Sequence, residues 1–400
     1  DGEAPLSYLP TIVKYRSAAT DLSNAQYVAY LFLRPSYMTD LIPTKPMAHV
    51  RFVKADGSLH EVDLIWSAEK YSDKIQDMVK SETSKFPGLS RQLDLRVSFA
   101  NDLNSIVDNG RFEMGQTNPI FLTEQVKEKY KFAQVYPTDE TRKKFGLEDK
   151  EKPAIYASLY KFQGKTILLV RSATYHPEDF KPAVYMKAYQ ALLSDFNDLA
   201  DVLVIDQTHN PGGSYCADFY NIFAKDDDVQ GVQRMRSDRK WINDLQINWP
   251  NEEQVDDPYG ATVERAWSLI VEKSYDQGDF LSAPIPLFTG SVKAEKKKFN
   301  WTKPMLVLID ELAGSCGDIF PMLVKANHRA TLFGQTTMGL GGNVEEVVQL
   351  QNSRVHVRMT RGLFFPYKND VKEEDKDYVE NNGVSPDVSY AHTVEDFRGG

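Results

Sequence analysis

A serine that could act as a nucleophile stands where an apolar stretch gives way to a helix. The stretch Met305–Asp310 reads MLVLID, and the residues Ala313–Asp318 that follow it read AGSCGD. The pattern beyond this point predicts a helix from about Cys316 to Ala326, so Ser315 would be its N-cap or its first residue. There the hydroxyl could cap the helix, or it could attack a substrate while the helix dipole stabilises the developing negative charge. The residues alone favour the cap, and Asp318 fits a capping box weakly.

A glycine-rich turn that could bind an oxyanion follows a second apolar stretch. Val202–Asp206 reads VLVID, and Asn210-Pro-Gly-Gly213 comes shortly after it. The two glycines leave backbone N–H groups unobstructed, and a helix expected to begin near Ser214 would place them at its positive end. The same residues also suit an ordinary strand-to-helix turn. Because both loops follow strands expected in one parallel sheet, we expect them at the same sheet edge, where α/β folds place their sites.

The elements that must position these loops alternate between strand and helix. Thr166–Arg171 predicts a third buried strand, and apolar residues at helical spacing predict a helix over Ala183–Leu199. Short, continuous apolar strands suit a sheet that is covered on both faces. The sequence therefore predicts an α/β fold with a layered βαβ core.

Changes of pattern along the chain divide it into regions. Near the N-terminus, Ala48–Val53 and Leu59–Trp66 alternate with period two around Asp56-Gly57, which predicts a β-hairpin. Much later, Asp257–Lys273 predicts a capped helix inside a long insertion. The predicted regions are a small β-containing N-terminal region (1–85), a mixed connecting region (86–164) and the α/β domain (165–400), with the insertion at about 226–300.

The composition argues against several classes of function. The chain has 400 residues, is 42% hydrophobic and carries a net charge of −10, which fits a globular protein and argues against non-specific binding to nucleic acid or an anionic membrane. The basic run Lys293–Lys298 is short enough to be a solvated loop. No apolar run reaches the ~18 residues of a membrane span, and no signal peptide is visible. Cys216 and Cys316, the two cysteines, form no CxxC metal site, and a bridge between them stays open.

Several short motifs occur in an order that resembles a known enzyme family. They are DxxxNPGG at 206–213, SCGDIFP at 315–321, NHRAT at 327–331 and ENNGVSP at 380–386. Together they are similar to the motifs of the tail-specific (C-terminal processing) serine peptidases, and most to those of the branch of the chlamydial protease-like activity factor. The resemblance covers about residues 165–390. It implies a crotonase/ClpP-like core, and it implies that residues 1–85 include the end of a PDZ-like domain.

The resemblance also implies roles for particular residues. Ser315 would be the nucleophile, and backbone N–H groups of Gly212 or Gly213 and of Cys316 would bind the oxyanion. Glu380, in the ENNGVSP motif, would orient a histidine and stabilise its charged form. The alternative for Glu380 is a solvated acid in an acidic stretch. Cys316 itself is expected to be a small packed residue whose N–H matters, rather than a nucleophile. No metal and no cofactor are expected.

The general base is the departure from the family pattern. Ordinary members use a Ser–Lys dyad, but Leu340 stands where that lysine would be. The resembling branch uses a histidine that lies upstream, and residues 1–48 contain none. The base would then come from an N-terminal piece outside this chain, or from elsewhere in the chain, or the protein would be inactive. Among the seven histidines, His209 is the best internal candidate because it directly precedes Asn210.

These observations predict a serine endopeptidase that cleaves peptide bonds through an acyl-enzyme. The alternative is a peptide-binding or scaffolding protein that keeps the peptidase fold without turnover. Acyl-CoA chemistry on a crotonase-like fold ranks last, because nothing in the chain indicates a nucleotide or CoA site. A protein or peptide substrate, a possible homodimer and a secreted or periplasmic location are implied by the family resemblance, and no nucleic-acid partner is expected.

Overall fold

The computed structural model describes separate stretches of the chain. They divide into two compact units that are treated separately, with the first including residues 1–113 and the second including 114–345 and 360–391. The described residues are 5–12, 18–25, 47–54, 56–65, 124–136, 138–144, 155–175, 182–213, 215–225, 228–247, 258–286, 301–349, 356–367, 378–391 and 393.

The first unit contains the predicted β-hairpin. β1 (Met47–Val53) and β2 (Leu59–Ile65) pair antiparallel. Gly57 turns the chain with a φ of +83° and donates its N–H to the carbonyl of Lys54 at 2.9 Å, as an Asp-Gly turn requires. The hairpin prediction is therefore confirmed. Two short helical segments also belong to this unit, η1 (Pro5–Tyr8) and α1 (Leu9–Ile12).

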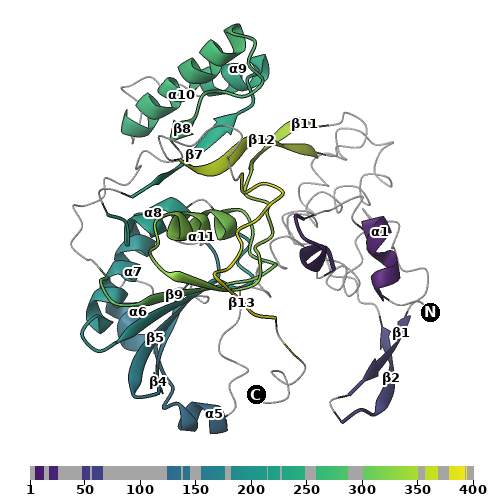
Figure 1. The fold of residues 1–400 in the computed structure, drawn as a ribbon, viewed down its shortest axis with the longest axis vertical. Helices are drawn as coiled ribbons and strands as arrows, with labels where there is room; N and C mark the ends of the chain where they lie inside the picture. Colours follow the sequence, from purple (N-terminus) through teal and green to yellow (C-terminus); the bar gives the residue numbers. More distant parts are fainter. Residues whose placement is uncertain are drawn as a thin grey trace, which may run out of the picture. The chain divides into compact units, whose positions relative to one another are not determined.

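The second unit is built on a seven-stranded sheet whose order is β13-β10-β9-β6-β5-β4-β3 (Figure 1). Its central strands β5, β6, β9 and β10 run parallel to one another, while β3 and β4 are antiparallel neighbours. The strands are β3 (Ala133–Tyr136), β4 (Ile155–Phe162), β5 (Lys165–Ser172), β6 (Val202–Asp206), β9 (Met305–Ile309), β10 (Thr331–Gly334) and β13 (Val388–Ser389).

The parallel strands confirm the predicted α/β fold class. All three strands predicted from apolar runs are present as β5, β6 and β9, and β6 and β9 are adjacent. The sheet also includes β3 and β4, which come from the stretch predicted as a mixed connecting region. The proposed domain boundaries themselves stay a prediction.

The helices of this unit include two that begin at the predicted site loops. α8 (Cys216–Asn221) follows the NPGG loop and α11 (Cys316–Ala326) follows Ser315. They pack against each other through Phe219 and Phe320, whose ring centroids are 5.1 Å apart. The other helices beside the sheet are α5 (Glu124–Lys129), α6 (Asp139–Lys144) and α7 (Pro182–Phe196).

The insertion forms a layer of its own beyond α8 and α11 (Figure 1). Its strands belong to a four-stranded sheet of order β11-β12-β7-β8. A small second core under α9 and α10 contains Met235, Trp241 and Ile285. The insertion contributes β7 (Gln230–Met235), α9 (Arg239–Ile247), α10 (Pro258–Asp276) and β8 (Ile285–Pro286). The other two strands of this sheet, β11 (Asn343–Gln349) and β12 (His356–Tyr367), come later in the chain. The predicted loop Lys293–Lys298 lies outside the described residues.

Candidate active site

Ser315 occupies a backbone conformation that side chains rarely adopt. Its φ is +56° and its ψ is −120°, outside the regions that L-residues favour. Such a conformation costs ~1–3 kcal/mol and persists only where the surrounding structure enforces it, which is common at active sites. The residue stands at the N-cap position of α11, but its hydroxyl makes no capping hydrogen bond. The cap role favoured by the residues alone is therefore wrong for the side chain.

Gly212 lies directly against Ser315, which brings the two predicted loops together. A Cβ on Gly212 would stand 2.5 Å from Ser315 Cβ and 2.8 Å from the backbone nitrogen of Cys316. The φ of Gly212 is +106°. Both the close approach and the positive φ therefore require glycine at this position.

Asn210 ties the NPGG loop to both neighbours. Its side-chain nitrogen donates to the carbonyl of Ser172 at the end of β5 (2.8 Å), and its own carbonyl accepts the N–H of Gly314 (2.9 Å). Gly317 makes room for that carbonyl, since a Cβ there would stand 2.4 Å from it. The asparagine of NPGG and the glycine of SCGD are thus two parts of one packing arrangement.

Gln207 is a buried link that the sequence reasoning missed. Pro321 inside α11 has no N–H, so the carbonyl of Gly317 lacks the donor that an α-helix would provide. The side-chain nitrogen of Gln207 donates to that carbonyl at 2.8 Å, and its side-chain oxygen accepts the hydroxyl of Tyr175 at 2.7 Å. The proline is the signal that could have predicted it, because a buried carbonyl left without a donor needs one from elsewhere.

The backbone donors of the loop are not equivalent. The N–H of Gly212 donates to Asn210 Oδ1 at 2.8 Å. Within the described residues, the N–H groups of Gly213 and Cys316 have no hydrogen-bond acceptor. Gly213 sits at a φ of +142° in a bridge with Tyr175. Of the three N–H groups predicted for an oxyanion hole, two are therefore available.

Asp318 holds the loop that carries Leu340. It is fully buried in the first turn of α11 and accepts the N–H groups of Gly339 (2.9 Å) and Leu340 (3.1 Å). Burial raises the pKa of Asp318 to about 7, against hydrogen bonds from Thr337, Gly339, Leu340 and the N–H of Ser315 that favour its charged form. Asp318 stands three residues after Ser315, at the capping-box position that the sequence suggested, and its carboxylate accepts the N–H groups of the Leu340 loop.

The same loop reaches both Ser315 and Glu380. The N–H of Met338 donates to the carbonyl of Ala313 at 2.8 Å, two residues before Ser315. At its other end, the N–H of Gly342 donates to Glu380 Oε2 at 2.6 Å. The loop therefore links the serine segment to the ENNGVSP segment.

Glu380 is fixed by two donors rather than free in solvent. Besides the N–H of Gly342, the hydroxyl of Thr360 donates to Glu380 Oε1 at 3.0 Å. A carboxylate accepts up to about four hydrogen bonds, so capacity remains for an imidazole N–H. Glu380 is therefore hydrogen-bonded within the described structure, and its role in orienting a histidine stays a prediction.

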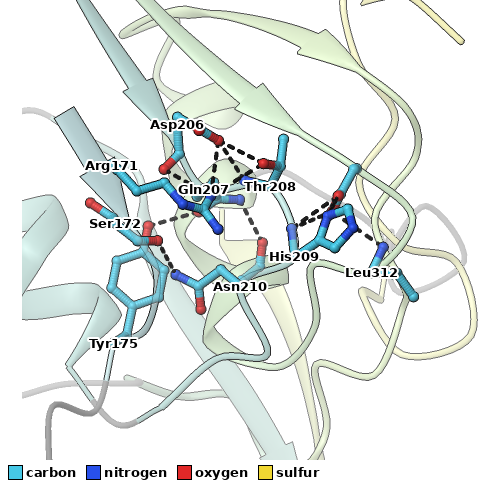
Figure 2. A network of polar contacts seen from close by, with 11 residues as sticks. Arg171, Ser172, Tyr175, Asp206, Gln207, Thr208, His209, Asn210 and Leu312 are labelled. Atoms are coloured by element: carbon cyan, nitrogen blue, oxygen red, sulfur yellow. Dashed lines mark hydrogen bonds and ion pairs between the residues drawn. The ribbon is translucent and has the colours of Figure 1, made fainter. Parts of the chain in front are cut away.

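His209 forms an ion pair with Asp310, at the end of β9 (Figure 2). Its Nδ1 contacts Asp310 Oδ2, and its backbone N–H donates to both carboxylate oxygens, at 2.8 and 2.9 Å. Burial alone would lower the pKa of His209, but its hydrogen bond to Asp310 and the charge of that group outweigh burial and raise the pKa. The φ of His209 is +56°. No hydrogen bond joins it to Ser315 in the described structure.

Figure 2 also shows a second polar group at the end of β6, on the other side of the loop from His209. The buried guanidinium of Arg171 donates to Asp206 Oδ1 at 3.0 Å, and Thr208 donates to the same oxygen at 2.7 Å. Both groups hold the loop that leads into Asn210. The pairing of His209 with Asp310 holds this loop to the end of β9, and the role of His209 as a base stays a prediction.

The two cysteines are joined. Cys216, the first residue of α8, forms a disulfide with Cys316, the first residue of α11, and their Cα atoms are 5.3 Å apart. This answers the question that the sequence left open. Among the described residues there is no cluster of side chains suited to a metal ion.

The fold is a mixed α/β fold with a serine at the start of a helix, and the comparisons with known proteins place it in a family. Residues 166–390 match peptidase family S41. The chain belongs to this family of serine peptidases, and the predicted resemblance to its tail-specific, CPAF-like members is confirmed.

Particular relatives are chlamydial. A protein of Chlamydia pneumoniae is 30% identical over 55% of this chain and 38% of its own length. A protein of Chlamydia trachomatis is 28% identical over 55% of this chain and 40% of its own length. The matched part is thus about two fifths of each relative. The solved structure of mature CPAF complexed with lactacystin is similar in fold over all of this chain and 73% of its own, with a TM-score of 0.66 and 20% identity.

No helix in the described part of the chain has both the length and the apolar character that crossing a membrane requires.

Proposed function

We propose that this protein is a serine endopeptidase with Ser315 as its nucleophile. The observation that carries the proposal is the strained backbone of Ser315 at the start of α11, with Gly212 packed against it and no capping bond to its hydroxyl. A helix cap needs no strain, whereas a nucleophile gains from being held clear of the helix beside backbone N–H groups.

In the proposed reaction, Ser315 Oγ attacks the scissile carbonyl carbon while a base takes the hydroxyl proton. The N–H groups of Gly213 and Cys316 stabilise the negative oxygen of the tetrahedral intermediate, because neither has another acceptor among the described residues. Gly212 serves by its close approach rather than by its N–H, which Asn210 occupies. The leaving amine takes the proton, and water then releases the acyl group from the serine.

Glu380 is proposed to orient the imidazole that acts as the base. Its fixed position, with Gly342 and Thr360 as donors, suits an acceptor for the Nδ1–H of a histidine. As the family resemblance implies, that histidine would come from a segment outside these 400 residues. The internal alternative is His209, whose Nδ1 already has a carboxylate partner in Asp310.

The substrates are proposed to be proteins or peptides. A secreted or periplasmic location and a homodimer are carried over from the family resemblance alone. We propose no nucleic-acid partner, given the net charge of −10.

Replacing Glu380 by Gln tests the proposed mechanism. The test uses the full-length translated protein, a fluorogenic peptide library, and Asn382→Ala as the control. Asn382 is exposed in the same turn and bonds only main-chain carbonyls. We expect Glu380→Gln to lower kcat by about 10⁴, as loss of the orienting carboxylate does elsewhere, with the control unchanged. Equal activity of the two variants would remove Glu380 from the mechanism.

The second candidate is a peptide-binding protein without turnover. It is favoured by one observation, that no histidine within the described residues bonds Ser315 or Glu380. If the protein only binds peptides, the wild-type protein and a Ser315→Ala variant should bind library peptides with the same affinity. Neither of them would release a cleaved product. Cleavage by the wild-type protein that Ser315→Ala abolishes excludes this candidate.

A further inference from the structure

The Cys216–Cys316 disulfide joins the two helix starts that carry the proposed oxyanion donors. Cys316 supplies one of these N–H groups itself and is the neighbour of Ser315. Cys216 begins α8, three residues after Gly213, which supplies the other. The bridge closes a separation of 100 residues between them. No other cysteine exists in the chain to exchange with either partner.

The NPGG loop is bonded to the serine segment before Gly212, because the carbonyl of Asn210 accepts the N–H of Gly314 at 2.9 Å and Gln207 donates to the carbonyl of Gly317 at 2.8 Å. From Gly212 to Tyr215 the described chain is bonded on its outer side. On the outer side, the N–H of Tyr175 donates to the carbonyl of Gly212 at 2.8 Å, and Tyr215 N–H donates to the carbonyl of Tyr175 at 3.1 Å. These bonds attach the NPGG loop to the residues after β5, not to α11. Between the first turns of α8 and α11, the disulfide is the covalent contact, supported by the packing of Phe219 on Phe320.

We propose that Cys216 is a positioning residue for the peptidase reaction. Its bridge to Cys316 sets the distance between the N–H donors of Gly213 and Cys316. The rate at which Ser315 is acylated therefore depends on whether the two cysteines are joined as a disulfide. The inference rests on the proposed function. It gives Cys216 a role in the reaction and makes the reaction rate depend on redox state, neither of which acylation of a serine requires.

Reduction would disturb the site because two bonded sulfurs become two non-bonded thiols. A dithiol reductant supplies two electrons and two protons; the S–S bond breaks, both cysteines become thiols, and the reductant closes to a cyclic disulfide. The sulfurs must then separate by roughly 1–2 Å to reach van der Waals contact. Both cysteines are buried in close-packed surroundings, so the helix starts must shift or the side chains must rotate. A misplacement of about 1 Å at a catalytic group costs up to about 100-fold in rate.

The test compares oxidised and dithiothreitol-reduced full-length protein, with the thiol count checked by alkylation and intact mass. The readouts are the rate of fluorophosphonate labelling of Ser315, kcat and KM for a cleaved peptide, and the melting temperature. The assay temperature is kept well below the lower melting point. We expect the labelling rate and kcat to fall by about 10- to 100-fold on reduction, with KM little changed, and to recover on reoxidation. A Cys216→Ala variant should match the reduced protein and should not respond to the reductant.

A bridge that serves stability alone gives a different result. In that case reduction lowers the melting temperature while labelling and kcat stay at the oxidised values, and this overturns the inference but leaves the proposed function intact. If two thiols are alkylated before any reductant is added, the disulfide does not form in the protein, and the inference is overturned. If Ser315 is labelled in neither state, the proposed function fails, and the inference fails with it.

Discussion

Gly212 offers a sharp test of how the two loops are held, because alanine there would enter space already filled. The added Cβ would stand 2.5 Å from Ser315 Cβ, 2.7 Å from the carbonyl oxygen of Gly314 and 2.8 Å from Cys316 nitrogen. Ordinary contact begins near 3.4 Å, so the loops must separate by about 1 Å. Overpacking of this kind costs ~1–3 kcal/mol, and a positive φ adds ~1–2 kcal/mol for alanine.

We therefore expect Gly212→Ala to lower the free energy of unfolding by about 2–5 kcal/mol and the labelling rate of Ser315 by about 100-fold. Gly164→Ala is the matched control, since Gly164 has a φ of +77° with nothing within 4 Å of its added Cβ. It should cost only the ~1–2 kcal/mol of backbone strain and leave labelling unchanged. Urea unfolding and labelling kinetics measure both quantities. A folded Gly212→Ala protein that is labelled at the wild-type rate would show that this close approach does not position Ser315.

Two further predictions concern the links behind the loops. Gln207→Leu should lower the free energy of unfolding in urea by about 2–5 kcal/mol, because it leaves the carbonyl of Gly317 and the hydroxyl of Tyr175 without this partner; a change below about 0.5 kcal/mol would contradict the link. The pKa of His209 is higher in the folded protein than its value of about 6.5 in the unfolded chain. The ion pair with Asp310 therefore contributes its full stability at a pH below about 6.5, and this contribution is lost as the pH rises through the folded pKa. Urea midpoints from pH 5.5 to 8.5 should therefore fall more for the wild-type protein than for His209→Gln, and parallel curves would be evidence against the pair.

Much of the fold follows from local pattern. β5, β6 and β9 are short apolar runs, and a continuous apolar run is typical of a strand that is buried on both faces of its sheet. α11 begins at Cys316 and ends at Ala326, as its apolar spacing predicts. β3 and β4 were not predicted, because their residues mix polar and apolar types at the antiparallel side of the sheet.

The sequence indicated candidate site residues, but not the geometry in which they lie. The motifs indicated Ser315, Gly213 and Glu380, since each follows a strand or lies in a segment with family resemblance. The strain at Ser315 and the occupied N–H of Gly212 arise from contacts between loops about 100 residues apart, which no local pattern encodes. The disulfide also joins residues far apart in the sequence, and the spacing of two cysteines does not predict whether their side chains meet.

Covalent labelling is the direct test of whether Ser315 is an activated nucleophile. Full-length protein is treated with a fluorophosphonate, digested and mapped by mass spectrometry, beside a Ser315→Ala variant with the same melting temperature. We expect a single phosphonyl adduct on Ser315 in the wild-type protein and none in the variant. An adduct of equal yield in the variant, or an unmodified Ser315 in wild-type protein that cleaves peptides, would contradict this expectation.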